Sequence, residues 1–378
     1  SWLPRYELDS GAGRRSGTLV DCAAVSRPER FSGTSMLTVL TFDLNRELGT
    51  GDAVSIVADG DTVYGTGKSL YIADDHVTHG LVGGARRPSF APAEQRTEVY
   101  QFDVSAPGKP VYVASGGVDG ALLNQYSLSE YAGQLRLATT TGQQAGKTES
   151  MVTVLNRRGD ELVQVGRVGG LGVGERIYAV RFLGPVGYVV TFRQTDPLYT
   201  VDLSNPAQPR VTGELKITGY SAYLHDAGPG RLIGVGQEAT ERGRQTGTQV
   251  SLFDTGNLSS ARRLAQYQLP GGSSEVEADP HAFLYWPDKG LVVVPVMSAR
   301  FDDGTGQPAM GGALVLRLAG DSFTELGLIT HPTDRDRYPD ATVRRAAVIG
   351  DELWTVSGSG ALVNDLERLA QRAWIPFG

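Results

Sequence analysis

The sequence LTVLTFDL at Leu37–Leu44 recurs as TEVYQFDV at Thr97–Val104, as DPLYTVDL at Asp196–Leu203 and as TQVSLFDT at Thr248–Thr255. Each copy alternates apolar residues with others and then reaches an Asp, which is the pattern of a half-buried β-strand that ends in a turn. Looser copies of the phrase are SMVTVLNR (Ser150–Arg157), GALVLRLA (Gly312–Ala319) and GALVNDLE (Gly360–Glu367). The copies lie about fifty residues apart, a spacing typical of the repeated sheets of a β-propeller.

Working outward from each copy, the chain divides into units of four expected strands. The clearest unit is 177–216, in which IYAVRFLG, GYVVTFR, PLYTVDLS and PRVTGELK follow one another. We therefore predict an all-β fold, a β-propeller of about seven four-stranded blades, or eight if upstream sequence adds one. The chain 1–378 is expected to form this single domain, with 1–34 as an N-terminal segment. Further units are expected at 62–116, 126–168, 221–269, 281–330 and 343–377.

The first unit is shorter than the others. An expected strand at Ala53–Ala58 follows Leu37–Leu44, but no convincing pair of strands precedes it. Thr18–Ser26 is a candidate for one of the two. Because an incomplete blade leaves an exposed edge strand, we expect either the C-terminal strand or sequence outside the chain to complete this blade.

The composition narrows the class of protein. Of the 378 residues, 40% are hydrophobic and 20% are charged, with a net charge of −7, which is an ordinary globular mixture. No Lys- and Arg-rich run suited to nucleic acid occurs, and no apolar run reaches the ~18 residues of a membrane-spanning helix. The one cysteine, Cys22, is expected to be a small buried residue; pairing with a segment outside the chain is the alternative.

Two glycine-rich stretches fail to complete a nucleotide-binding motif. GTGKS at Gly65–Ser69 has Thr62 where a P-loop needs its first glycine, and a strand rather than a helix is expected after it. GGLGVG at Gly169–Gly174 lacks the dinucleotide-binding spacing. The sequence also contains neither a G-x-S-x-G elbow nor an H-E-x-x-H motif. We expect a hairpin turn and a connection at these two stretches.

The strongest candidate for a site is the segment Glu275-Val-Glu277-Ala-Asp279-Pro-His281. In an extended chain alternate residues share one face, so Glu275, Glu277, Asp279 and His281 would point the same way. Carboxylate oxygens suit Ca²⁺, and an imidazole admits another divalent metal. The alternative is a solvated acidic loop, since a linear run seldom surrounds an ion alone and Pro280 interrupts the pattern.

Four further residues are candidates for a ligand site near the propeller channel. His225 ends the strand that corresponds, one blade earlier, to the strand entered by the acidic segment. Arg181, Arg193 and Asp196 belong to the polar positions of RFLGPVGYVVTFRQTD. A salt bridge between blades explains these three residues as well as a ligand does.

Four long phrases resemble a known family: GGVDGALLNQYSLSEYAGQLRLATT (116–140), VGGLGVGERIYAVRF (168–182), GYVVTFRQTDPLYTVDLSNPAQPRVTGELKITGYSAYLH (187–225) and GSSEVEADPHAFLYWP (272–287). The chain is similar over nearly its whole length to secreted bacterial and archaeal proteins with a C-terminal β-propeller domain. The resemblance implies an extracytoplasmic location, secreted or attached to the cell surface. It also implies that the chain is the C-terminal part of a longer precursor. The family supplies no catalytic motif.

Two functional hypotheses follow. The first is a non-catalytic extracytoplasmic scaffold that binds a protein or a surface glycan, and possible partners include the chain's own upstream polypeptide; it rests on the propeller repeat and on loops long enough for recognition. The second is a metal-assisted hydrolase or lyase that uses Glu275, Glu277, Asp279 and His281, because a bound metal lowers the pKa of its water. Convergence of these side chains with His225 around a pocket would favour the enzyme.

Overall fold

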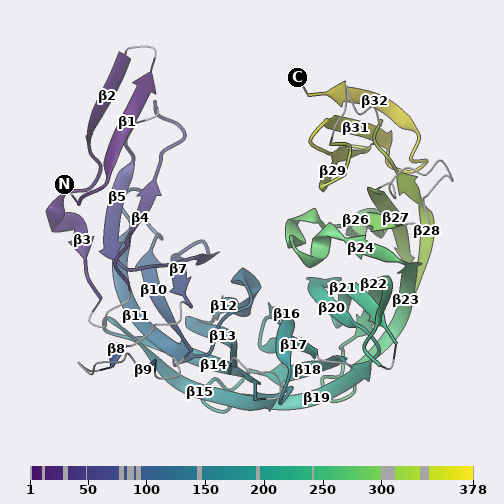
Figure 1. Cartoon of the computed structure of the whole chain (residues 1–378), viewed down its shortest axis with the longest axis horizontal. Coiled ribbons are helices and arrows are strands. Elements are labelled where there is room, and N and C mark those ends of the chain that lie inside the picture. The colour runs from purple at the N-terminus through teal and green to yellow at the C-terminus, as the bar shows by residue number, and fades with distance from the viewer. Residues whose placement is uncertain are drawn as a thin grey trace. The chain divides into compact units, whose positions relative to one another are not determined.

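The computed structural model of the chain describes residues 2–10, 13–28, 33–47, 49–75, 81–82, 89–90, 95–142, 147–192, 196–240, 242–298, 311–332 and 340–377. The chain divides into two compact units, Ser1–Gly174 with Leu203–Pro209, and Glu175–Asp202 with Arg210–Gly378. Both units are built from antiparallel sheets of the kind that the repeats predict (Figure 1). No helix in the described ranges is long and apolar enough to cross a membrane.

The first unit contains two four-stranded sheets and one smaller sheet. The outermost strands of the two larger sheets, β11 and β15, meet in a single parallel pair, Ser115 with Glu161, which joins the two into one eight-stranded sheet. The larger sheets are β6 (Thr62–Gly65), β7 (Ser69–Asp74), β10 (Arg96–Asp103) and β11 (Val111–Asp119), and then β12 (Leu128–Tyr131), β13 (Gln134–Thr141), β14 (Glu149–Arg158) and β15 (Glu161–Leu171). The smaller sheet has the order β3 (Val25–Ser26), β5 (Asp52–Val57), β4 (Met36–Thr41), and two separate hairpins are β1 (Arg5–Ser10) with β2 (Gly13–Thr18) and β8 (Leu81–Val82) with β9 (Ser89–Phe90).

The second unit contains four sheets in chain order. In the third of them the innermost position is divided between two short strands, β24 and β25, which both pair with β26. The sheets are β16 (Arg176–Leu183), β17 (Val186–Phe192), β18 (Asp196–Asp202) and β19 (Arg210–Ile217); β20 (Tyr220–Asp226), β21 (Arg231–Ala239), β22 (Gln245–Asp254) and β23 (Arg262–Pro270); β24 (Gly272–Ser274), β25 (Leu284–Trp286), β26 (Leu291–Ser298), β27 (Gly311–Ala319) and β28 (Ser322–Ile329); and β29 (Arg345–Ile349), β30 (Glu352–Val356), β31 (Gly360–Asp365) and β32 (Gln371–Pro376).

The repeated phrase forms the third strand of its sheet, and its Asp closes the turn that follows. In four copies the Asp carboxylate accepts a hydrogen bond from the backbone N–H two residues later, at 2.9 Å for Asp103 and 3.0 Å for Asp43, Asp254 and Asp365. This Asx turn is the reason that a short acidic side chain recurs at that point. The predicted all-β propeller is therefore confirmed in its four-stranded blades, whereas the number of blades in the complete protein stays a prediction.

Glycines in outer strands allow one blade to approach the next. A Cβ on Gly116 of β11 would lie 2.2 Å from the Leu162 carbonyl oxygen, and one on Gly213 of β19 would lie 2.3 Å from that of Leu258. Leu258 lies in the connection between the third and fourth strands of the following blade, β22 and β23. Leu162 lies near the start of β15, the fourth strand of the blade that follows β11. No side chain fits in such a gap, so the close approach requires glycine.

The N-terminal segment differs from its prediction in two ways. Thr18–Ser26 does supply a strand, but this strand, β3, pairs in parallel with β5 and not with β4. Cys22, expected to be buried, is exposed, because it lies in a short 3₁₀ turn, η1 (Cys22–Ala24), that contains no buried residue. GTGKS forms the expected hairpin turn between β6 and β7, closed by a 2.8 Å hydrogen bond from the Thr66 N–H to the Ser69 carbonyl.

Candidate functional site

The acidic segment does not have the extended conformation that was expected of it. It folds into two 3₁₀ turns, η3 (Glu275–Glu277) and η4 (Pro280–Ala282), between β24 and β25. Ser274 begins the first turn with a capping box, in which its hydroxyl accepts from the Val276 N–H at 3.2 Å and Glu277 accepts from the Ser274 N–H at 3.3 Å. Asp279 caps the second turn. The four side chains therefore do not alternate along one strand face, as the metal-site prediction assumed.

Two of the four predicted metal ligands are engaged with protein partners. Glu277 accepts hydrogen bonds from the Tyr220 hydroxyl at 3.2 Å and from the Gln237 side-chain amide at 2.5 Å. Asp279 accepts from the backbone and ring nitrogens of His281, both at 3.0 Å, and forms an ion pair with Arg345.

The charge state of Asp279 follows from these partners. Partial burial opposes ionisation, but the hydrogen bonds from His281 and Arg345 outweigh it and lower the pKa of the Asp279 carboxyl. Glu275 and His281 are exposed. In the described ranges no three His, Cys, Asp or Glu side chains are grouped so that they could hold a metal ion, and the predicted Ca²⁺ or other divalent metal stays a prediction.

The structure does bring Arg181 and His225 together, through Tyr223. Arg181 on β16 donates from Nε to the Leu224 carbonyl and from a terminal nitrogen to the Tyr223 hydroxyl, both at 2.9 Å. The Tyr223 oxygen lies 3.0 Å from Nδ1 of His225. The Tyr223 oxygen therefore accepts from a guanidinium and lies within hydrogen-bond distance of the imidazole, so it links the two side chains. Tyr223 could have been found from YSAYLHD, where it precedes His225 by two residues.

Aromatic rings surround this histidine. The His225 ring centroid lies 4.9 Å from that of Phe283 and 5.9 Å from that of Tyr285, in the next sheet. Burial, followed by the positive charge of Arg181, lowers the pKa of His225 to about 4. The imidazole is thus uncharged at neutral pH. Of the other predicted channel residues, Arg193 and the side chain of Asp196 lie outside the described residues.

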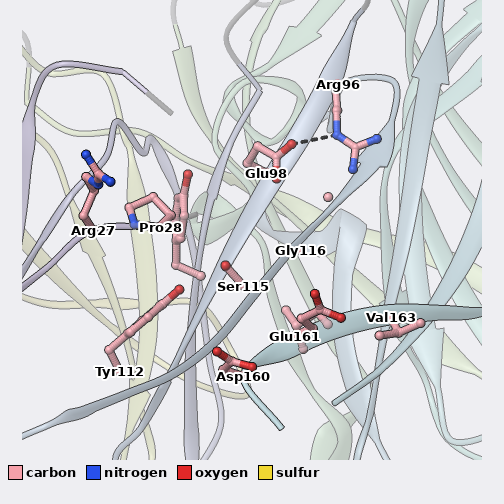
Figure 2. Close-up of a pocket in the computed structure, with 13 residues that line it drawn as sticks. Arg27, Pro28, Arg96, Glu98, Tyr112, Ser115, Gly116, Asp160, Glu161 and Val163 are labelled. Atoms are coloured by element: carbon pink, nitrogen blue, oxygen red, sulfur yellow. Dashed lines mark hydrogen bonds and ion pairs between the residues drawn. The ribbon is translucent and has the colours of Figure 1, made fainter. Parts of the chain in front are cut away.

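A pocket that the sequence did not predict lies in the first unit, where β11 and β15 meet. Its volume is about 620 Å³, which is within the range of ligand pockets. Figure 2 shows Arg27 and Arg96 at opposite sides of it, with Asp160 and Glu161 also at its wall. Four separate segments supply the lining, which explains why no single motif revealed it. The lining residues are Arg27, Pro28, Arg96, Glu98, Tyr100, Tyr112, Ser115, Gly116, Gly117, Asp160, Glu161, Leu162 and Val163.

The pocket presents charges of both signs. On one side Arg96 is paired with Glu98 at 2.6 Å (Figure 2) and lies 3.7 Å from Asp119. Arg27, Asp160 and Glu161 are exposed. A surface with this mixture suits a ligand that carries both charges more than a simple cation or anion.

Tyr112 and an edge strand complete the pocket wall. Burial raises the pKa of Tyr112, and nearby Asp160 raises it further against the opposing effect of Ser115, so its hydroxyl stays protonated and can donate. Strand β11 pairs with β10 along its length but with β15 only at Ser115. At this point the edge is occupied, since the Ser115 N–H donates to the Asp160 carbonyl at 3.0 Å and Gly116 packs against Leu162. Away from this contact the outer edge of β11 has no strand neighbour among the described residues, so that part of it can bond to an added strand.

The blades and their phrase define the class of protein as a β-propeller, and comparison with known proteins agrees. The model of the β-propeller domain family matches residues 1–369. The chain therefore belongs to this family.

Its relatives include archaeal proteins. It is 43% identical over 272 residues to the uncharacterized protein MJ1554 of Methanocaldococcus jannaschii, and the match covers 70% of this chain and 39% of the relative. It is 40% identical over 201 residues to an uncharacterized protein of Archaeoglobus fulgidus, covering 53% of this chain and 30% of the relative. The match thus spans less than two fifths of the length of either curated relative.

Among solved structures, the periplasmic gluconolactonase PpgL of Pseudomonas aeruginosa is similar to the chain. The TM-score is 0.48 and the identity 12%, with 87% of this chain and 90% of that chain covered.

Proposed function

We propose that this chain is part of a non-catalytic binding propeller, and that it takes an extended segment of a partner protein into the pocket between β11 and β15. The observation that carries the proposal is the pocket's combination of exposed charges of both signs with an open strand edge. A polypeptide offers the same combination, since it has charged side chains and a backbone that can pair with an edge strand.

The charges favour a protein over a glycan as the partner. Arg27 and Glu161 are exposed at the pocket, and complementary charges across an interface determine orientation and partner choice. A neutral glycan carries no charge that could pair with these ionic groups. We also propose that the protein lies outside the cytoplasm, secreted or attached to the surface, which the resemblance of its sequence to secreted proteins supports; fractionation of the source cells tests that location.

The alternative function, a metal-assisted hydrolase or lyase, makes a different demand on the molecule. It needs Glu275, Glu277, Asp279 and His281 to converge on an ion. Glu277 and Asp279 would first have to leave Tyr220, Gln237 and Arg345. The scaffold requires no such rearrangement.

The test is a charge exchange between the pocket and its ligand. A library of random linear peptides is selected on the 378-residue protein, and the affinity of each selected peptide is measured again on Arg27→Glu and Glu161→Lys. We expect each reversal to weaken binding about fivefold or more, since one exposed ion pair contributes up to ~1 kcal/mol and its reversal adds repulsion. Reversing the matching charge in the peptide should restore the affinity.

Arg15→Glu is the matched control, because Arg15 is an exposed arginine of the same unit, lies opposite Leu8 in its hairpin and is not among the residues that line the pocket. It should leave the affinity unchanged. Selected peptides that bind Arg27→Glu and Glu161→Lys as tightly as the original protein would contradict the proposed site. A library that yields no binder at all would contradict the proposal as a whole.

A further inference from the structure

The first copy of the repeated phrase, Leu37–Leu44, has the same sequence pattern as the other copies, but its apolar side chains are more exposed. Phe42 is 47% exposed. The residues at the same position of the phrase, Phe102, Val201 and Phe253, are 0%, 0% and 1% exposed. One sequence position is thus buried in three sheets and half open in the fourth.

Leu44, two residues further on, shows the same difference more strongly. It is 92% exposed, whereas Leu203 and Thr255 at the corresponding position are 5% and 3% exposed. A protein gains free energy by burying such side chains, and Phe42 and Leu44 are exposed together in the turn that directly follows the edge strand β4.

Strand β4 nevertheless occupies the third-strand position of a regular blade. The Thr41 hydroxyl donates to the carbonyl of Gly108 in the following blade at 2.5 Å. Thr200, at the same position of the phrase, donates to the carbonyl of Leu258 in its own following blade, also at 2.5 Å. The contact of β4 with the following blade is therefore the same as in a complete blade. The greater exposure of Phe42 and Leu44 must then arise on the opposite side of β4, where the second strand of a complete blade would lie.

The complete blades show what covers this position. Phe253 packs in one apolar cluster with Leu224 of β20 and Leu232 of β21, the first and second strands of its sheet. In the smaller sheet β4 has a single strand neighbour among the described residues, β5. Figure 1 shows β4 and β5 alongside β10, and Val39 and Ile56 of this pair share an apolar cluster with Tyr100. Among the residues that the structure describes, β4 therefore has no first and second strand beside it.

The hairpin β1–β2 does not fill that place. Among the described residues its strands pair with one another and with no strand of the smaller sheet. The sequence of β2 is GRRSGT, with five exposed positions out of six. In the next blade a similar hairpin, β8–β9, lies between the second strand, β7, and the third, β10. By analogy, β1–β2 stands where an insertion between the second and third strands would stand.

We propose that the open edge of β4 docks a two-stranded antiparallel hairpin that completes this sheet as a blade, and that the hairpin belongs to the same protein, in sequence beyond these 378 residues. Every complete blade takes its first two strands from the same chain as its third. The two archaeal relatives are much longer than the parts that match, which cover 39% and 30% of their lengths. The proposal does not depend on the function proposed for the pocket.

Cysteine labelling tests the proposal directly. Cys22, the one cysteine, is replaced by Ser, and Phe42→Cys is introduced into the 378-residue chain and into the product of the complete source gene. We expect the thiol to react with a maleimide rapidly in the shorter protein and about tenfold or more slowly in the complete product, because burial makes labelling depend on local opening. Val111→Cys is the control, since Val111 is 57% exposed on an outer strand, and it should react equally in both proteins.

A measurement on unmutated protein guards against destabilisation by Phe42→Cys. Hydrogen exchange of the peptide that contains β4 should be slower in the complete product than in the shorter chain. Equal labelling and equal exchange in the two proteins would overturn the proposal. Protection that appears in the shorter chain only as its concentration is raised would also overturn it, because a second copy would then be the occupant.

Discussion

His331 shows how a single buried residue can connect stability to pH. It is 3% exposed; its Nδ1 lies 2.8 Å from the Ser357 hydroxyl and its Nε2 lies 2.9 Å from that of Thr355. Its ring packs edge-on against Trp374, with the centroids 5.0 Å apart. Burial lowers the pKa of His331 to about 4 although a hydrogen bond involving Thr355 acts in the opposite direction. The imidazole of the folded protein is therefore neutral at pH values above about 4.

We expect this histidine to destabilise the fold in acid. The unfolded chain takes up the proton near pH 6.5 and the folded chain only near pH 4, so the free energy of unfolding falls as the pH is lowered through this window. The contribution of one such histidine is about 2 kcal/mol by pH 4.5. Urea denaturation at several pH values should show a smaller loss in His331→Gln than in the original protein. Between pH 7.5 and 8.5 neither the folded nor the unfolded state titrates at this site. In that range the free energy of unfolding should change with pH equally in the two proteins.

Gly116 gives a second prediction at the residue scale. An alanine Cβ there would lie 2.2 Å from the carbonyl oxygen of Leu162, so the contact between β11 and the following blade must open. We expect Gly116→Ala to lower the free energy of unfolding by about 2 kcal/mol or more, as overpacking typically does. Gly67→Ala is the control, because no atom lies within 4 Å of the Cβ position of Gly67. Equal stabilities for the two variants would mean that the blades are not in close contact at Gly116.

At the scale of elements, the two glutamates of the turn η3 distinguish a structural role of this segment from a metal-binding role. Glu277 accepts from Tyr220, Gln237 and its own capping residue, whereas Glu275, in the same turn, is exposed. We expect Glu277→Ala to cost about 2 kcal/mol of stability, from a lost cap and buried donors left unpaired, and Glu275→Ala to cost under ~0.5 kcal/mol. Thermal denaturation measures both.

The metal hypothesis predicts a different outcome for the same pair of variants. If the segment holds Ca²⁺ or another divalent ion, the ion stabilises the folded state in proportion to its occupancy, and chelation should lower the melting temperature of the original protein. Glu275→Ala should then weaken the response as much as Glu277→Ala does. With the contacts observed for Glu277, we expect chelator and added Ca²⁺ to leave the melting temperature unchanged.

The same segment shows how far the sequence can lead at this scale. The strands of the blades were predictable, because alternation and a terminal Asp depend on local backbone geometry that is repeated along the chain. The alternating acids of the 275–281 segment imitated that pattern. A competing signal was present: Ser274 and Glu277 have the S-x-x-E spacing of a capping box, and Asp279 precedes a proline. Capping chemistry decided the conformation of the segment.

The two candidate sites also differ in how far the sequence could predict them. Arg181 and His225 could be proposed from sequence because each lies on the first strand of its own blade, and first strands are neighbours in space. The pocket at β11 and β15 could not, because Arg27, Arg96 and Glu161 come from segments far apart along the chain. Their proximity depends on how two blades and the N-terminal segment pack, which no local pattern encodes.

At the scale of the whole molecule, the open edge at β4 predicts that the 378-residue chain is less stable than a protein in which the blade is complete. Phe42 is already half exposed, so we expect Phe42→Ala to cost about 1 kcal/mol or less in the shorter chain. If the proposed hairpin covers Phe42 in the product of the complete gene, the same substitution removes a buried ring there and should cost about 3–5 kcal/mol. Phe253→Ala is the matched control: Phe253 has the same place in the phrase and is 1% exposed, so its replacement should be costly in both proteins. Urea denaturation of the two variants in each protein gives the four values. An equal cost of Phe42→Ala in both would show that sequence beyond the 378 residues does not cover Phe42, and would leave the apolar edge of β4 facing solvent.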